Sequence, residues 1–240
     1  MVLAGDHVQI LVDGYELTGD HNKVVINDAR KLLAASAFGE AVEKYLPGQR
    51  QAKLEHNGYF NPETGRSHPV LNGVLVDGVV SIVIGQNAEP VIGDPMYNLL
   101  SQQEQYISNA EVGNIVPFSA NFTTRTGQRA GWGLALAVPV SMTNTSNGSS
   151  LDNGNATNNG GMAFLHILKR TASDLYDIEV EGSSDNSAWS SLGSFTLDGS
   201  ALGSESLALS GTVPRYLRYS ATRSGSAGDS LKLAISVVRF

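Results

Sequence analysis

The sequence predicts a mainly β protein built in two parts. Short runs of alternating apolar and polar residues recur along the chain, and turn residues such as Asp-Gly and Pro-Gly separate them. The 240 residues are 41% hydrophobic, enough to fill one large core or two modest ones. We expect a β-sandwich or barrel with one short helix over residues 1–140, a polar linker or arm over 141–161, and a C-terminal β-sandwich, jelly-roll or immunoglobulin-like, over 162–240.

The N-terminal part begins with a predicted hairpin. His7 to Val12 alternates strong β-formers, and Asp13-Gly14 follows as a turn signal before the strand pattern resumes. Residues 28–35 have the spacing of a short helical turn. Residues 39–46 contain good helix formers that stop at Pro47-Gly48.

Further strands are expected in the rest of this part. Residues 51–60 alternate apolar and polar side chains, as a half-buried strand does. Residues 70–84 are rich in Val and Ile and indicate two strands joined at Asp77-Gly78. Residues 95–107 are either a helix or a long loop, and residues 114–125 form another strand.

The clearest boundary lies between Ser141 and Gly161, where Asn, Thr, Ser and Gly replace apolar residues almost completely. Such a segment cannot bury enough surface to fold alone, so it is either a linker or an arm that becomes ordered against another subunit. Six β runs at short intervals follow it, which favours a sandwich. They are residues 162–169, 176–182, 189–197, 205–209, 216–222 and 231–240.

Composition excludes several classes of protein. The chain has no cysteine, which rules out disulfides and thiolate metal sites and suits a reducing cytoplasm. Its net charge is −7, and residues 1–150 hold 9 basic and 14 acidic residues, so a nucleic-acid reader is disfavoured. The first residues lack the basic region of a secretory signal. The longest apolar run, residues 134–140, is too short to span a bilayer, so we expect no membrane partner.

No constellation of catalytic or metal-binding residues stands out. The histidines lack the spacing of a zinc site, and the chain has neither a Gly-x-Ser-x-Gly elbow nor a phosphate loop at residues 127–133. Residues 152–155 resemble half of a calcium loop but lack its closing glutamate. Asp177, Glu179 and Glu181 alternate as on a solvated strand face. We therefore expect no enzyme activity, no metal and no cofactor.

Two aromatic residues of the C-terminal part are candidates for glycan contact. Trp189 follows the polar turn of residues 183–188 and leads into a strand, and an aromatic ring at such a place can stack on a sugar. Tyr216, at the start of a later strand, is the second candidate. A tryptophan that anchors the core of the sandwich is the more ordinary interpretation of Trp189.

Two sets of short motifs resemble proteins of bacteriophage virions. The first set resembles, in the same order, the opening of the major tail tube proteins of long-tailed phages. Its members are Val12 to Thr18 (VDGYELT), Ala37 to Gly39 (AFG), Tyr45 to Gly48 (YLPG) and Leu54 to Phe60 (LEHNGYF). The second set, residues 178–189, 211–218 and 234–239, is similar to C-terminal domains of phage virion proteins.

This resemblance implies a tail-tube-like fold for the N-terminal part and a decoration role for the C-terminal sandwich. It implies rings of six subunits that stack into a tube, with other tail proteins as partners and DNA passing through without specific binding. The protein would be made in the host bacterial cytoplasm and reside in the virion tail. The candidates for contacts between subunits are Phe38, Tyr45, Pro47, Tyr59, Phe60 and Pro69.

Two other functions fit the same residues. A capsid decoration or head–tail connector protein would also assemble, but without long tubes. A carbohydrate-binding adhesion module would use the C-terminal sandwich and its aromatic residues. The acidic N-terminal part fits a DNA conduit, and it fits ordinary solubility equally well.

Overall fold

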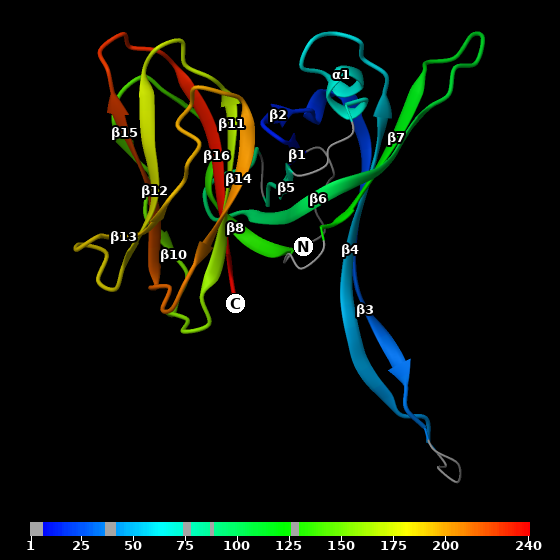
Figure 1. The fold of residues 1–240 in the computed structure, drawn as a ribbon, viewed down its shortest axis with the longest axis horizontal. Helices are drawn as coiled ribbons and strands as arrows, with labels where there is room; N and C mark the ends of the chain where they lie inside the picture. The colour runs from blue at the N-terminus through cyan, green and yellow to red at the C-terminus, as the bar shows by residue number, and fades with distance from the viewer. Residues whose placement is uncertain (1–6, 37–41, 74–77, 87–88, 126–129) are drawn as a thin grey trace.

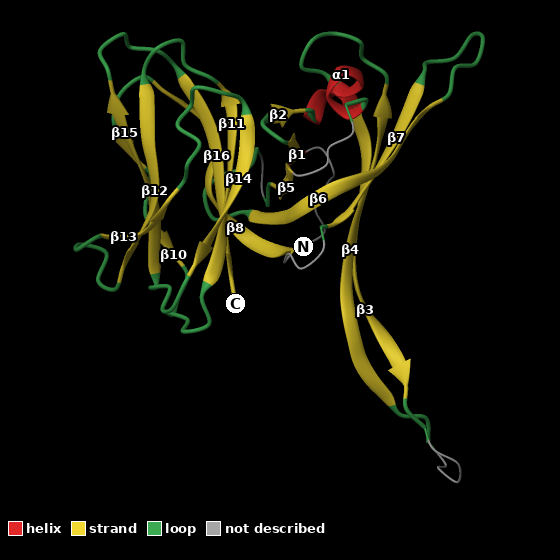
Figure 2. Cartoon of the chain, in the orientation of Figure 1, coloured by secondary structure: helices red, strands yellow, loops and turns green. Residues whose placement is uncertain are grey.

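The computed structural model describes residues 7–36, 42–73, 78–86, 89–125 and 130–240. It is mainly β, as predicted, with one short helix, α1 (Ser67–Leu71), and a 3-10 turn, η2 (Thr18–Asp20) (Figures 1 and 2). No helix within these ranges is long and apolar enough to cross a bilayer. The strands are β1 (Val8–Val12), β2 (Tyr15–Glu16), β3 (His21–Ala34), β4 (Tyr45–Tyr59), β5 (Gly78–Ile84), β6 (Pro95–Ser108), β7 (Pro117–Thr124), β8 (Ala130–Met142), β9 (Ser146–Asn147), β10 (Leu151–Asp152), β11 (Gly161–Lys169), β12 (Leu175–Ser183), β13 (Ser190–Ser194), β14 (Gly203–Leu209), β15 (Tyr216–Ser224) and β16 (Leu231–Arg239).

One antiparallel sheet runs through both halves of the chain. Its strand order is β14-β11-β16-β8-β6-β5-β1-β2, and β7, β4 and β3 branch from β6. Strand β8 is the joint, because Leu134 pairs with Pro95 of β6 while Val140 pairs with Leu233 of β16. The N-terminal and C-terminal parts therefore share a backbone hydrogen-bond ladder.

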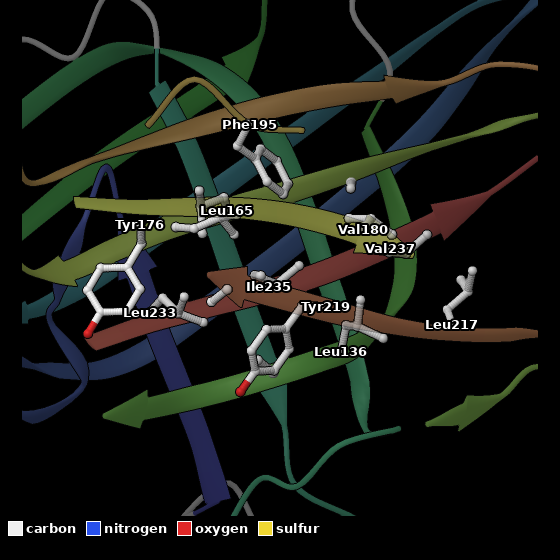
Figure 3. Close-up of a cluster of buried hydrophobic side chains, with 14 of the residues drawn as sticks. Leu136, Leu165, Tyr176, Val180, Phe195, Leu217, Tyr219, Leu233, Ile235 and Val237 are labelled. Atoms are coloured by element: carbon white, nitrogen blue, oxygen red, sulfur yellow. The ribbon is translucent and has the colours of Figure 1, made fainter. Parts of the chain in front are cut away.

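A second sheet completes the C-terminal sandwich. Its order is β10-β15-β12-β13, with β9 also paired to β15. Side chains of both sheets meet in one core, where Tyr176 and Val180 of β12 lie near Leu233 and Ile235 of β16 (Figure 3). The alternation expected along β12 is present, since every second side chain points into this core.

The polar segment of residues 141–161 is ordered against its own chain. Asn147 of β9 pairs with Ser220, and Leu151 of β10 pairs with Leu217. Asp152 also forms two hydrogen bonds with Arg215, of 2.7 and 2.6 Å. Backbone pairing with β15, together with burial of Met142 and Leu151 in the sandwich core, therefore holds a segment expected to be a linker or an arm.

Three segments expected to be helical are not helices. Of residues 39–46, the structure describes 42–46: residues 42–44 belong to the turn before β4, and Tyr45 and Leu46 begin β4 itself. Residues 28–35 lie largely in β3, where Asp28 pairs with Ala52 and Leu33 pairs with Leu46. Residues 95–107 lie in β6, which pairs with β5, β7 and β8. In each of these segments, pairing with partners distant in sequence overrides the local helical preference. The observed helix, α1, overlaps the first of the two strands expected over residues 70–84, and Asp77 lies outside the described residues.

A buried polar network crosses the joint between the two parts. His166 Nε2 donates to Ser81 Oγ at 2.9 Å, and the backbone N–H of Gly14 donates to His166 Nδ1 at 3.4 Å. Asn98 Oδ1 accepts from Ser81 Oγ at 2.8 Å and from Ser236 Oγ at 2.7 Å. All four side chains are fully buried, and burial lowers the pKa of His166 to about 3. The histidine is therefore neutral and can hold both bonds.

A second set of contacts closes the same joint. Ser204 Oγ of β14 donates to Asp13 at 2.7 Å and accepts from the backbone N–H of Val79 at 2.8 Å. Gly14 has φ +81°, and a Cβ there would lie 2.3 Å from the nitrogen of Gly203. The Asp13-Gly14 turn, predicted from sequence, is thus also a docking point that only glycine allows.

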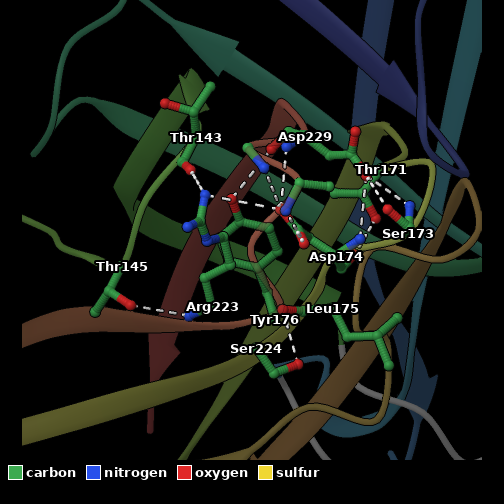
Figure 4. A network of polar contacts seen from close by, with 12 residues as sticks. Thr143, Thr145, Thr171, Ser173, Asp174, Leu175, Tyr176, Arg223, Ser224 and Asp229 are labelled. Atoms are coloured by element: carbon green, nitrogen blue, oxygen red, sulfur yellow. Dashed lines mark hydrogen bonds and ion pairs between the residues drawn. The ribbon is translucent and has the colours of Figure 1, made fainter.

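Two loops at one end of the sandwich hold each other through carboxylates (Figure 4). The Asp174 carboxylate accepts from the backbone N–H groups of residues 227–229, and Asp229 accepts from those of residues 172–174. Burial raises the pKa of Asp174, but these bonds and Arg223 at 3.7 Å outweigh it, so its pKa is lowered. Both carboxylates are occupied structural acceptors.

Replacement of Asn98 by alanine tests the polar network. Asn98→Ala leaves two buried hydroxyls without their acceptor, and each unsatisfied group costs about 1–3 kcal/mol. We expect the free energy of unfolding, measured by urea denaturation, to fall by about 3 kcal/mol. The control is Asn121→Ala, which removes a surface bond to Gln105 and should change stability by less than about 0.5 kcal/mol. Equal losses in the two variants would contradict a special role for the network.

Candidate functional site

The β3–β4 hairpin projects from the body of the protein (Figure 1). Strand β4 has β7 as a second neighbour only from Lys53 onward, so residues 28–34 and 45–52 form a ribbon of two strands. We call this ribbon, with the turn residues described at 35–36 and 42–44, the arm. A two-stranded ribbon is marginal in water on its own. The arm therefore favours a partner that covers it.

The arm exposes apolar side chains on both faces. Leu32 is 61% exposed, and Leu33, Tyr45 and Leu46 are also largely exposed. Neighbouring residues on a strand point to opposite faces, so Leu32 and Leu33 lie on different sides of the ribbon. Contiguous exposed apolar side chains mark sites of protein–protein contact. Basic residues flank them: Arg30, Lys31, Lys44 and Arg50.

A second hairpin, formed by β6 and β7, points in the opposite direction (Figure 1). Its turn, residues 109–116, is called the tip loop here. Val112 is fully exposed and Ile115 is 72% exposed. Glu111 adds a negative charge beside them. The molecule thus presents an apolar, acidic loop at one end and an apolar, basic arm at the other.

The structure separates the predicted contact residues into two groups. Tyr45 and Pro47 lie in the arm, whereas Tyr59, Phe60 and Pro69 lie at the other end of β4, beside α1. The 15 residues of β4 span about 46 Å at 3.3 Å per residue. Phe38 is outside the described residues. The candidates therefore mark opposite ends of the molecule and stay predictions.

Asp20 fixes the end that carries α1. Its carboxylate accepts from the backbone N–H of Ser67 at 2.9 Å and from Asn61 Nδ2 at 3.0 Å. The ring of Phe60 then packs on His68, with centroids 4.3 Å apart. Tyr59 remains 45% exposed beside this cluster. The η2 turn therefore holds in place the segment that carries this aromatic surface.

Two histidines pack at the root of the arm. The rings of His21 (β3) and His56 (β4) lie 5.0 Å apart and contact Phe118 and Phe122 of β7. His21 Nδ1 donates to the carbonyl of Leu17 at 2.7 Å, but neither nitrogen of the fully buried His56 has a hydrogen-bond partner. Burial, and then the neighbouring His21, hold the pKa of His56 well below its usual value.

A cavity of about 320 Å³ opens where the arm meets β8. Its lining residues are Asp28, Ala29, Arg30, Arg50 and Trp132, and we call it the Trp132 pocket. Asp28 accepts two hydrogen bonds from Arg50 and one from the hydroxyl of Tyr97, the latter at 3.2 Å.

Trp132 contacts the Tyr97 ring edge-on at 5.2 Å and is still 47% exposed. Among the described residues, Arg30 has no ion-pair partner. Sequence reasoning missed this pocket, because only the fold brings Trp132 beside the arm.

The glycan candidates lie on the outer face of the second sheet. The Arg218 guanidinium sits 4.3 Å from the ring centroid of Trp189, and its Nε donates to Glu181 at 2.6 Å. Arg215 lies 4.8 Å from the ring of Tyr216. Trp189 is half-buried and outside the sandwich core, which differs from the ordinary expectation of a core anchor. Glycan contact at both aromatics stays a prediction.

Over the described ranges, no three His, Asp or Glu side chains are arranged to hold a metal ion. Asp174 and Asp229 accept hydrogen bonds from backbone N–H groups, and Asp152 and Glu181 pair with Arg215 and Arg218.

Comparison with known proteins gives remote structural likenesses. No protein-family model and no curated protein matches the chain. It is similar to a protein in the virion of a native gene transfer agent particle, with TM-score 0.44 and 11% identity, covering 55% of this chain and 98% of that one. It is also similar to the Dit protein of phage SPP1, a hub adsorption apparatus protein, with TM-score 0.35 and 11% identity. That match covers 97% of this chain and 99% of the Dit chain.

A third likeness is to the insecticidal δ-endotoxin Cry8Ea1 of Bacillus thuringiensis. Its TM-score is 0.29 at 11% identity, covering 92% of this chain and 53% of that one. Phage-type tail proteins are thus among the similar structures. Scores and identities this low carry over no residue role.

The buried histidine pair predicts a pH dependence at the root of the arm. Because its folded-state pKa lies below 6.5, His56 contributes full stability above pH 6.5 and loses about 1.4 kcal/mol per pH unit below it. Between pH 7.5 and 5.5, His56→Leu should therefore lose about 1.4 kcal/mol less unfolding free energy than the wild type in urea titrations. An unchanged pH dependence would show that His56 is not held neutral.

Proposed function

We propose that this protein is a structural subunit of a bacteriophage tail that assembles head to tail into stacked rings forming the tail tube. The four motifs between Val12 and Phe60, which follow one another in the same order as in tail tube proteins, support the tail assignment. The observation that carries the assembly is the arm, a ribbon with exposed Leu32, Leu33, Tyr45 and Leu46 that no third strand joins within the described residues. An assembled neighbour would remove these side chains from water.

The two projecting hairpins suit head-to-tail stacking of copies. The arm and the tip loop leave the body in opposite directions (Figure 1), so each copy offers different surfaces to the copies on its two sides. Contacts between unlike surfaces close into rings or extend as helical stacks. Lateral contacts within a ring, six copies by the sequence resemblance, would use the outer edge of β3, whose single partner among the described strands is β4.

The remaining parts take secondary roles in this proposal. The excess of acidic residues in the first 150 positions would let DNA pass without binding. The C-terminal sandwich would decorate the outside of the tail. The protein would act without catalysis. Rings that never stack would favour the capsid decoration or connector alternative, and specific glycan binding by the purified protein would favour the adhesion alternative.

Electron microscopy of the purified full-length chain tests the proposal. We expect rings at moderate concentration and short stacks of rings when the protein is concentrated. Protein that stays monomeric at every concentration would overturn it. Single rings without stacks would overturn the tube assignment and leave a ring-forming connector.

Charged substitutions in the arm should block assembly without unfolding the subunit. Leu33 and Leu46 are cross-strand partners and exposed, so the double variant Leu33→Asp, Leu46→Asp puts two charges on a surface that assembly would bury. We expect sedimentation velocity to show monomer where the wild type assembles, with an unchanged circular dichroism spectrum.

The matched control for the arm is Leu175→Asp, at a similarly exposed leucine of the sandwich, which should assemble like the wild type. Normal assembly by the arm variant would exclude the arm as an interface.

A further inference from the structure

We propose that the Trp132 pocket of one copy receives the tip loop of a second copy. This inference rests on the proposed head-to-tail assembly and names the two surfaces that meet in it. The pocket and the tip loop belong to the same chain, yet the tip loop points away from the arm (Figure 1), so the contact requires two molecules.

The pocket combines an exposed aromatic ring with an available cation. Asp28 accepts two hydrogen bonds from Arg50, which hold that guanidinium against the lining of the pocket. Arg30 lies on the same lining and has no ion-pair partner in the described part of the chain. Trp132 is half-exposed beside it. Such a site fits an apolar group next to a carboxylate, and Trp and Arg are the residues most enriched at the centre of protein interfaces.

The tip loop offers that chemistry. Val112 is fully exposed and Ile115 largely so, although both are apolar, and Glu111 lies beside them. The loop is ordered from within: Asn114 Nδ2 donates to Glu111 Oε2 at 2.8 Å, and the Asn114 N–H donates to the Glu111 carbonyl at 3.2 Å. One carboxylate oxygen of Glu111 is left for a partner. A loop that is already ordered loses less conformational entropy on binding.

The match assigns a role to each group. Glu111 of one copy would pair with Arg30 of the next, while Val112 or Ile115 covers Trp132. Since every copy carries one pocket and one tip loop, the same contact repeats from copy to copy along a stack. Assembly would remove the Glu111–Arg30 pair from water, so a register that placed like charges together there would be costly. The pairing therefore also fixes the register of stacking.

Charge reversal tests the pairing. Arg30→Glu and Glu111→Arg should each raise the concentration needed for half-assembly, measured by sedimentation velocity, by about tenfold or more. The combined variant Arg30→Glu, Glu111→Arg should restore assembly to within a few fold of the wild type. Rescue is the expected result, because a general loss of folding or charge would not be repaired by a second reversal.

The control is Lys31→Glu, the same charge change one residue further along the arm and on its opposite face, which should have a much smaller effect. Single reversals without effect, no rescue in the combined variant, or an equal loss in Lys31→Glu would each overturn the pairing while the proposed assembly stands. A wild-type protein that never assembles would overturn both.

Discussion

The constraint on which the structure depends is the joint between its two parts. Strand β8 gives backbone hydrogen bonds to both, and the buried bonds of Asn98 with Ser81 and Ser236 require that the two parts meet in one arrangement. Any shift of the joint would leave several buried polar groups unpaired in a medium of low dielectric constant. The polar network thus specifies geometry more than it adds stability.

The joint sets the position of the two projecting hairpins, the arm and the tip loop. The two largest cores bury clusters of apolar side chains, whereas the arm and the tip loop expose leucine, valine and isoleucine side chains to water. Exposed apolar side chains of this kind mark interaction surfaces, and assembly with like copies would cover them. Rigid attachment to the body would let these surfaces meet in a repeated register.

Sequence reasoning predicted what depends on local pattern. The β class, the Asp13-Gly14 hairpin and the alternation along β12 follow from periodicity and turn chemistry, and the structure confirms them. It failed where distant pairing decides: residues 28–35 look helical, but residues 28–34 lie in β3. The joint at β8 and the place of Trp132 beside the arm could not be predicted, because they exist only after strands far apart in sequence have paired.

A distance measurement between the two parts tests the central claim most directly. The chain has no cysteine, so Glu63→Cys and Ser187→Cys give spin labels at one exposed site in each part. Double electron–electron resonance on the doubly labelled protein should give a single narrow distance distribution at pH 7.5, centred on the separation in the structure. A broad or two-peaked distribution would show that the two parts move independently and would contradict the account.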